Sequence, residues 1–225
     1  MIRLHIIAEG QTEEEFVKSI LTEHLGDFDI STDVHCITTK RTETQVYRGG
    51  AVSYEQIKKD IILWLKQDRN SDARFTTMLD LYALPNDFPQ FDEARNKSDP
   101  YQKVEQLENA LSNDINDSRF IPYIQLHEFE ALILSEPSKF AERFPDYESG
   151  VEQLLNICAN LESPELINDG ANTAPSKQII KFIPVYKGSK PSAGPLIAKK
   201  IGLQRIRERC PHFNQWLTQL ETLTQ

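Results

Sequence analysis

The sequence predicts an α/β fold in which a small parallel sheet is flanked by helices and followed by a helical C-terminal part. Apolar, β-branched runs alternate with amphipathic stretches over the first 135 residues, whereas only helical patterns follow. Strands that alternate with helices of this length form βαβ units around a mostly parallel sheet. We therefore expect an α/β core over residues 1–135 and a helical extension, packed on that core, over residues 136–225.

The first strand and the first helix have clear signals. Residues 2–8, IRLHIIA, are apolar and β-branched, which favours a strand. Residues 12–25 repeat apolar side chains at helical spacing. Thr12 and Glu15 have the spacing of a capping box, so we expect Thr12 to cap this helix.

The later elements follow the same reasoning. Alternation, β-branched content and helical periodicity distinguish the strands from the helices, and prolines make residues 85–91 irregular. The polar, glycine-bearing residues 40–53 are expected to form a loop. The further strands are expected at 33–39, 74–84 and 119–126, and the further helices at 54–67, 101–114, 127–135, 151–161, 176–183, 195–210 and 212–223.

Composition excludes several classes of protein and of binding site. No apolar run approaches the roughly 18 residues that a membrane span needs, so we expect a cytoplasmic protein without a membrane partner. Three distant cysteines without a Cys-x-x-Cys pair make a zinc site or a disulfide framework unexpected. The net charge of −9 opposes a nucleic-acid clamp over the whole surface, although it permits a local basic track.

Acidic side chains stand at the ends of three expected strands. Glu9 follows the first strand, Asp80 interrupts the third with Asp87 just beyond it, and Glu128 and Glu130 follow the fourth. The carboxyl ends of parallel strands meet at one edge of a sheet. Because carboxylates suit Mg²⁺ or Mn²⁺, we expect a metal site made by Glu9, Asp80, Asp87 and Glu128. Glu9, Asp80 and Glu130 are the expected catalytic residues, with Glu9 or Glu130 as the base.

Several polar residues have two interpretations each, and Glu9 is one of them. Glu9 itself can be a solvated turn residue. His127 has no second histidine or cysteine at ligand spacing, so we assign it an orienting hydrogen bond rather than zinc ligation. A basic segment contains Lys177, Lys181 and Lys187, followed by Lys190 and by five lysines and arginines between residues 199 and 209. It is either a phosphate-binding track or the solvated face of a helix.

Several motifs resemble a known family. The stretches IIAEGQTEEEF, TTMLDLYALPNDFP, RFIPYIQLHEFEALILS and PSKQIIKFIP resemble the bacterial family called domain of unknown function 4276, over nearly the whole chain. That family is similar to the Toprim superfamily, in which a glutamate after the first strand and an Asp-x-Asp motif after the third serve Mg²⁺ chemistry. The resemblance places Glu9 at the glutamate and Asp80 at the first aspartate. Tyr82 stands at the second aspartate, so Asp87, or Glu128 and Glu130, would have to replace it.

Residues and resemblance together lead to a functional hypothesis. We expect a Mg²⁺-dependent, Toprim-like nuclease that acts on DNA or RNA phosphodiesters. The resemblance also implies a phage-defence setting with an ABC- or AAA-type ATPase partner. Two alternatives remain open: a non-catalytic effector or sensor subunit that docks on such an ATPase, and a nucleotide-binding or phosphotransfer enzyme that uses the same carboxylates.

Overall fold

The fold is organised around a parallel sheet to which the described residues contribute five strands. The structure is a computed structural model that describes residues 1–37, 53–167 and 173–224. Strand order is β2-β1-β3-β4, and β5 pairs with β3 beyond the end of β4. The strands are β1 (Ile2–Ala8), β2 (Ile30–Cys36), β3 (Ala73–Asp80), β4 (Phe120–Ile121) and β5 (Ile124–Gln125). The predicted α/β fold with a helical C-terminal region is confirmed.

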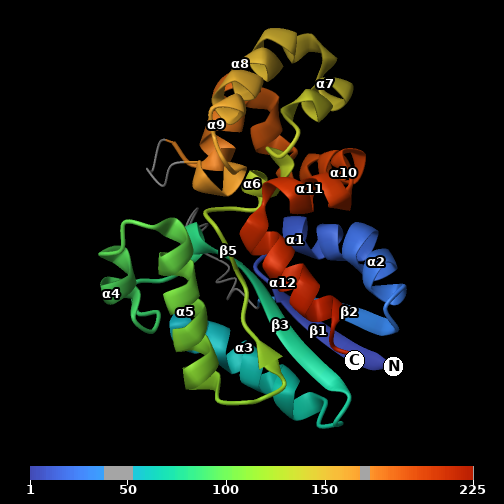
Figure 1. Ribbon diagram of the computed structural model, residues 1–225, viewed down its shortest axis with the longest axis vertical. Coiled ribbons are helices and arrows are strands. Elements are labelled where there is room, and N and C mark those ends of the chain that lie inside the picture. Colours follow the sequence, from blue (N-terminus) through green and yellow to red (C-terminus); the bar gives the residue numbers. More distant parts are fainter. Residues whose placement is uncertain (38–52, 168–172, 225) are drawn as a thin grey trace, which may run out of the picture.

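Helices cover both faces of the sheet (Figure 1). Alternate side chains of β1 enter different cores, because Leu4 and Ile6 pack on one face and Ile7 packs on the other. The first face is covered by α1 (Gln11–Phe16), α2 (Thr22–Gly26) and α12 (Pro211–Glu221), and the second by α3 (Tyr54–Gln67) and α5 (Pro100–Ile115).

Helix α12 is part of the central core although it lies near the C-terminus. The indole N–H of Trp216 donates a hydrogen bond to the hydroxyl of Thr76 on β3 at 2.9 Å. The Trp216 ring also stacks on Tyr123, with centroids 4.2 Å apart. Residues on both sides of position 135 thus share one apolar core, and the C-terminal segment supplies a layer of the α/β sandwich.

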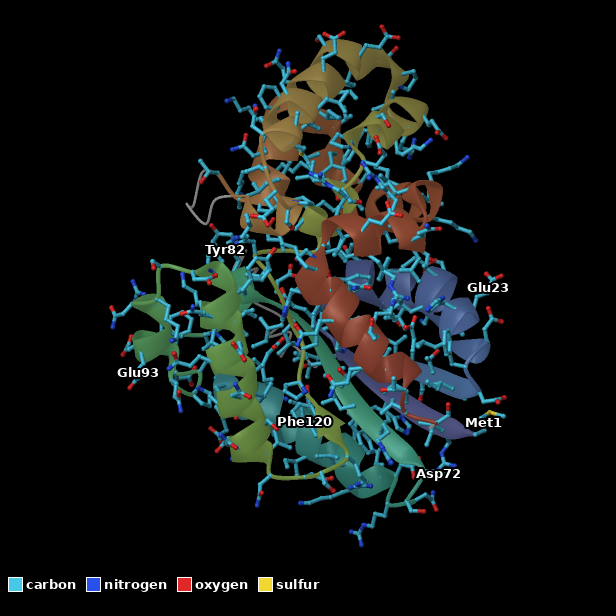
Figure 2. All side chains as sticks on the ribbon, in the orientation of Figure 1. Met1, Glu23, Asp72, Tyr82, Glu93 and Phe120 are labelled. Atoms are coloured by element: carbon cyan, nitrogen blue, oxygen red, sulfur yellow. The ribbon has the colours of Figure 1, made fainter. Side chains whose placement is uncertain are left out.

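The remaining helices gather beyond the carboxyl ends of the strands (Figure 1). Figure 2 marks this end of the sheet with Tyr82, whereas Met1 and Asp72 lie at the opposite end. These helices are α6 (Glu130–Ile133), α7 (Phe140–Arg143), α8 (Glu148–Ala159), α9 (Pro175–Phe182), α10 (Lys190–Ile201) and α11 (Leu203–Arg209), while α4 (Phe91–Arg95) lies beside α5.

The first helix begins earlier than its sequence pattern predicts. β1 ends at Ala8, and Gly10, not Thr12, is the N-cap residue of α1. The Glu13 carboxylate accepts the Gly10 backbone N–H at 3.0 Å, so Glu13 takes the role expected of Glu15. The expected Thr12 cap is therefore wrong. A π-helical turn over Val17–Leu21 separates α1 from α2, a feature that is frequent near functional sites.

Two other expected elements are each divided in two, one at a proline and one at a glycine. The expected strand 119–126 divides into β4 and β5 because Pro122 has no N–H to donate. The hydroxyl of Thr77 bridges the gap, since it donates to the carbonyl of Tyr123 and accepts its N–H, both at 2.9 Å. The expected helix 195–210 divides at Gly202, whose φ of 84° favours glycine.

Strand boundaries also differ from the prediction. β2 begins at Ile30 rather than at residue 33, and β3 ends at Asp80 in a short 3₁₀ turn, Leu81–Ala83. The carboxylate of Asp80 is therefore a strand-end group rather than a mid-strand one. Of the expected loop 40–53, residues 40–52 lie outside the described residues.

Candidate functional site

Glu9 and Asp80 lie together at the carboxyl edge of the sheet. Glu9 directly follows β1, and its backbone N–H donates to the Met78 carbonyl of β3 at 3.0 Å. Its carboxylate accepts the backbone N–H of Asp80 at 2.9 Å. The Asp80 carboxylate in turn accepts the N–H of Phe129 at 3.0 Å. One chain of contacts thus joins the end of β1, the end of β3 and the segment that leads into α6.

Two buried glutamates complete the acidic surroundings. Glu13 on α1 and Glu130 at the start of α6 are only 6% and 4% exposed. The Glu130 carboxylate lies 3.0 Å from the Lys190 ammonium and accepts the hydroxyl of Tyr186 at 3.3 Å. Buried carboxylates are costly unless they are paired or hydrogen-bonded. The Glu130 carboxylate is therefore stabilised by one ammonium group and one hydroxyl donor.

The carboxyl groups repel one another. We use the name acidic cluster for Glu9, Glu13, Asp80, Glu128 and Glu130, which interact electrostatically. Burial, reinforced by the neighbouring carboxylates, raises the pKa of Glu9 to about 7, and burial likewise raises the pKa of Glu13 to about 7. The pKa of Asp80 is raised well above its ordinary value for the same reasons.

The acidic cluster has the chemistry of a hard-cation site. Its donors are carboxylate oxygens, and within the described residues Lys190 is the one lysine or arginine that forms an ion pair with a member. A divalent cation would offset the remaining charge, and Mg²⁺ or Mn²⁺ prefers such oxygens. The oxygens are not gathered around a single point, because among described residues only His5, Asp33 and His35 place three ligand atoms within 4.8 Å of one another. Metal binding by the acidic cluster therefore requires rotation of its side chains.

Glu128 connects the acidic cluster to the C-terminal helices. Its carboxylate accepts the backbone N–H of Ser176, in the first turn of α9, at 3.0 Å. Acidic groups are favourable near a helix N-terminus. Lys177 is the next residue along α9 after this contact.

The structure does not bring every expected residue into the acidic cluster. Asp87 is exposed, and its carboxylate accepts the backbone N–H of Tyr54 at the start of α3, at 3.2 Å. His127 is buried, with a φ of 64°, and its carbonyl accepts the N–H of Tyr82 at 3.1 Å. A non-glycine residue with positive φ is uncommon and often marks a functional turn. His127 thus shapes the turn that presents Glu128 and Glu130.

The expected lysine track and the arginines beyond it differ in their surroundings. Lys177, Lys181 and Lys187 are all exposed. The ammonium of Lys181 lies 4.9 Å from the centre of the Phe182 ring. The arginines instead bind within the protein: Arg205 pairs with Glu136, Arg207 with Glu221, and Arg209 donates to the carbonyls of Cys158 and Leu161.

Sequence reasoning missed three residues of this site. Glu13 reads as a helix-start acid, and only the true helix start at Gln11 shows that its carboxylate turns back toward Gly10. Lys190 reads as one more lysine of a basic segment, although it pairs with Glu130. Tyr186 carries no local signal, because its contact with Glu130 joins residues 56 positions apart.

Comparison with known proteins identifies a family for this chain. No helix in the described part of the chain is long and apolar enough to cross a lipid bilayer. Searches of curated proteins and of solved structures each returned no match. One family model, described as a domain of unknown function (DUF4276), matches residues 8–221, which include every member of the acidic cluster. The chain therefore belongs to the DUF4276 family.

Proposed function

We propose that this protein is a metal-dependent phosphodiester hydrolase, a nuclease of the Toprim-like kind, whose active site is the acidic cluster. The observation that carries this proposal is the meeting of Glu9 and Asp80 with Glu13 and Glu130 at the carboxyl edge of a parallel sheet. Ligands of open α/β sheets bind at this edge. Groups whose pKa is strongly perturbed are concentrated at functional sites.

The members of the acidic cluster would have different roles in phosphodiester hydrolysis. A bound Mg²⁺ or Mn²⁺ would supply positive charge to the phosphate and acidify the attacking water. Glu9 and Asp80, at the ends of adjacent strands, are the groups that would hold it, with Glu128 beside them. Glu130, buried against Lys190 and Tyr186, is placed to take up a proton as general base.

Nucleic acid would approach along the lysines. The Lys190 side chain is 32% exposed, and its ammonium lies 3.0 Å from the Glu130 carboxylate. Lys177 and Lys181 extend from α9, whose first turn contacts Glu128, and Lys187 lies in the 3₁₀ turn Pro184–Gly188 that follows. Exposed lysines near a metal site are suited to phosphate oxygens. We propose that they guide DNA or RNA toward the acidic cluster, in the cytoplasm and in concert with an ABC- or AAA-type ATPase.

A second candidate is a non-catalytic subunit that docks on such an ATPase. It is favoured by Tyr82, which occupies the place of the second Toprim aspartate, and by the spread of the cluster oxygens. In that case the acidic cluster would be a charged docking or sensing surface. Fold alone does not decide between the two.

Cleavage assays with purified protein test the proposal. Labelled single-stranded DNA, double-stranded DNA and RNA are each incubated with Mg²⁺, Mn²⁺ or EDTA. We expect metal-dependent cleavage that Glu9→Gln and Asp80→Asn abolish without unfolding the protein. Glu15→Gln is the matched control, since Glu15 is an exposed carboxylate on the same helix as Glu13. Cleavage that persists in Glu9→Gln would rule out the acidic cluster as the active site. No cleavage of any substrate with Mg²⁺ or Mn²⁺ would favour the docking subunit.

A further inference from the structure

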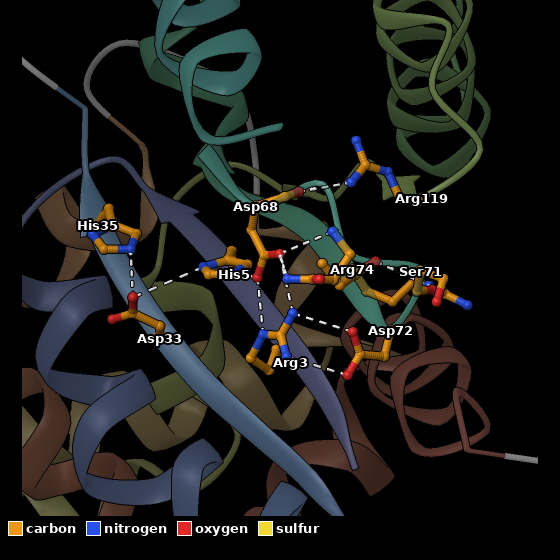
Figure 3. Close-up of polar contacts among 11 residues, drawn as sticks. Arg3, His5, Asp33, His35, Asp68, Ser71, Asp72, Arg74 and Arg119 are labelled. Carbon is orange, nitrogen blue, oxygen red and sulfur yellow. Dashed lines mark hydrogen bonds and ion pairs between the residues drawn. The ribbon is translucent and has the colours of Figure 1, made fainter. Parts of the chain in front are cut away.

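A second group of polar side chains lies on the α3 face of the sheet. His5 of β1 stands opposite Asp33 of β2 in the parallel register, and His35 follows two residues later on the same face. The Asp33 carboxylate lies 2.8 Å from Nε2 of His35 and 3.8 Å from Nδ1 of His5 (Figure 3). One ligand atom from each residue lies within 4.8 Å of the other two.

The two ring nitrogens that face Asp33 are buried. Neither Nδ1 of His5 nor Nε2 of His35 forms a well-oriented hydrogen bond within the described residues. Aromatic rings enclose the histidines, because Phe75 stacks on His5 with centroids 5.0 Å apart and Trp64 stacks on His35 at 3.3 Å. The His5 and His35 side chains are 12% and 21% exposed, whereas that of Asp33 is 59% exposed. The group therefore opens to solvent on the Asp33 side.

The orientation of His5 is fixed from behind. Its Nε2 lies 3.1 Å from the Asp68 carboxylate, which is itself held by Arg3 at 2.9 and 3.0 Å and by Asn70 at 2.7 Å (Figure 3). With Nε2 turned to the Asp68 carboxylate, the second ring nitrogen of His5, Nδ1, is the one that faces Asp33. Such a carboxylate–histidine pair is the usual second layer of a metal site.

His35 is also suited to bind a cation. Its Nε2 is buried and lies on the side of the Asp33 carboxylate, and a histidine binds zinc through such a ring nitrogen. Ligand atoms around a tetrahedral zinc, at bond lengths of about 2.0–2.2 Å, stand roughly 3.3–3.6 Å apart. The observed separations of 2.8 and 3.8 Å lie on either side of that range.

We propose that His5, Asp33 and His35 bind one divalent cation of the zinc class, with a water molecule on the open Asp33 side. Imidazole ligands favour Zn²⁺ over Mg²⁺, so this site and the acidic cluster would select different metals. His5 precedes Glu9 by four residues of extended chain, about 13 Å, which makes the two sites separate. The cation would join β2 to β1 and so strengthen the attachment of β2, which is the edge strand of the sheet within the described residues.

Zinc titration of the whole protein tests this proposal. After EDTA treatment and dialysis, Zn²⁺ is added in a calorimeter with millimolar Mg²⁺ present to occupy the acidic cluster. We expect one equivalent to bind and the melting temperature to rise. Asp33→Asn and His35→Gln should each lower the affinity at least tenfold, and Asp68→Asn should lower it about 10–100-fold. Co²⁺ should quench Trp64, which stacks on His35, more than Trp216 on the opposite face.

Three variants separate this site from other zinc ligands. Asp80→Asn, in the acidic cluster, and Cys36→Ser, at an exposed thiol, should bind Zn²⁺ as the wild type does. Asp27→Asn is a matched control for an exposed carboxylate. Asp33 is mostly exposed, so circular dichroism of the Asp33→Asn variant should show an intact fold. Equal Zn²⁺ affinity in Asp33→Asn, His35→Gln and wild type, or loss of binding in Asp80→Asn alone, would overturn the proposal.

Discussion

The carboxylate of Glu9 accepts the backbone N–H of Asp80 at 2.9 Å, so a side chain from the end of β1 holds the end of β3. Asp80 extends the same chain of contacts to Phe129, just before α6. The protein thus uses one oxygen of each carboxylate to fix backbone geometry. The other oxygen of each group is the one that our proposal assigns to a metal ion.

Glu9→Gln should stabilise the metal-free protein while it removes Mg²⁺ binding. Gln keeps the acceptor for the Asp80 N–H but has no charge to repel Glu13, Glu128 and Glu130. A pKa shift from 4.5 to about 7 corresponds to at most about 3 kcal/mol, so we expect a gain of about 1–3 kcal/mol at pH 8. Urea unfolding in EDTA measures it. If Glu9→Gln is less stable than the wild type in EDTA, the Glu9 charge does not destabilise the metal-free protein.

The stability of the metal-free protein should fall as pH rises from about 4.5 to above 7. The folded-state pKa values of Glu9 and Glu13 are raised to about 7, so folding favours their protonated forms. That contribution is complete below the unfolded pKa and is lost as pH passes the folded pKa. Melting temperatures measured in EDTA from pH 4.5 to 8.5 test this. Added Mg²⁺ should restore stability mainly at the alkaline end, and an equal rise at pH 5 and pH 8 would argue against the carboxylates as ligands.

Lys190→Met should move the acidic limb of the pH–activity profile to higher pH. Lys190 lowers the pKa of Glu130, whereas burial raises it, so removal of the ammonium leaves the effect of burial unopposed. A general base with a higher pKa becomes deprotonated only at higher pH. The measurement is kcat against pH, with Lys199→Met as the control at an exposed lysine of the same helix. A uniform loss of activity without a shift would limit Lys190 to substrate binding.

Trp216→Phe should destabilise the whole protein rather than its C-terminal part alone. The substitution removes the hydrogen bond to Thr76 and weakens the stacking on Tyr123, with an expected cost of about 1–3 kcal/mol. Because α12 and β1 share one core, unfolding should remain a single transition by fluorescence and by circular dichroism. Two separate transitions would mean that the helical segment folds independently of the sheet.

The edge at which the acidic residues meet was predictable, whereas their contacts were not. Parallel strands end at one edge, so the position of Glu9 and Asp80 after their strands is enough to place them together. Asp87 follows the same strand, yet the chain turns away and its carboxylate meets Tyr54 instead. The group around His35 depends on the β1–β2 register, because only that register sets His5 opposite Asp33. Sequence spacing alone cannot supply it.

The lysines of α9 and the turn after it provide the sharpest test of nucleic-acid binding. With a net charge of −9, the average surface repels a polyanion, so binding must come from a local patch. Lys177 and Lys181 are exposed and lie on the helix whose first turn contacts Glu128. Replacement of both by Ala should weaken binding and flatten the salt dependence by about one unit of slope per lost phosphate contact.

Fluorescence anisotropy with a labelled oligonucleotide, between 50 and 300 mM salt, measures this slope in EDTA so that cleavage does not interfere. Lys199→Ala with Lys200→Ala is the matched control, because these exposed lysines lie at the far end of α10 from Lys190. Both double variants should keep the wild-type fold, since exposed lysines contribute within about 0.5 kcal/mol to stability. If the Lys177 and Lys181 variant bound nucleic acid with an unchanged slope but lost an ATPase partner, these lysines would belong to a protein-docking surface. The second candidate function would then account for them better than the nuclease.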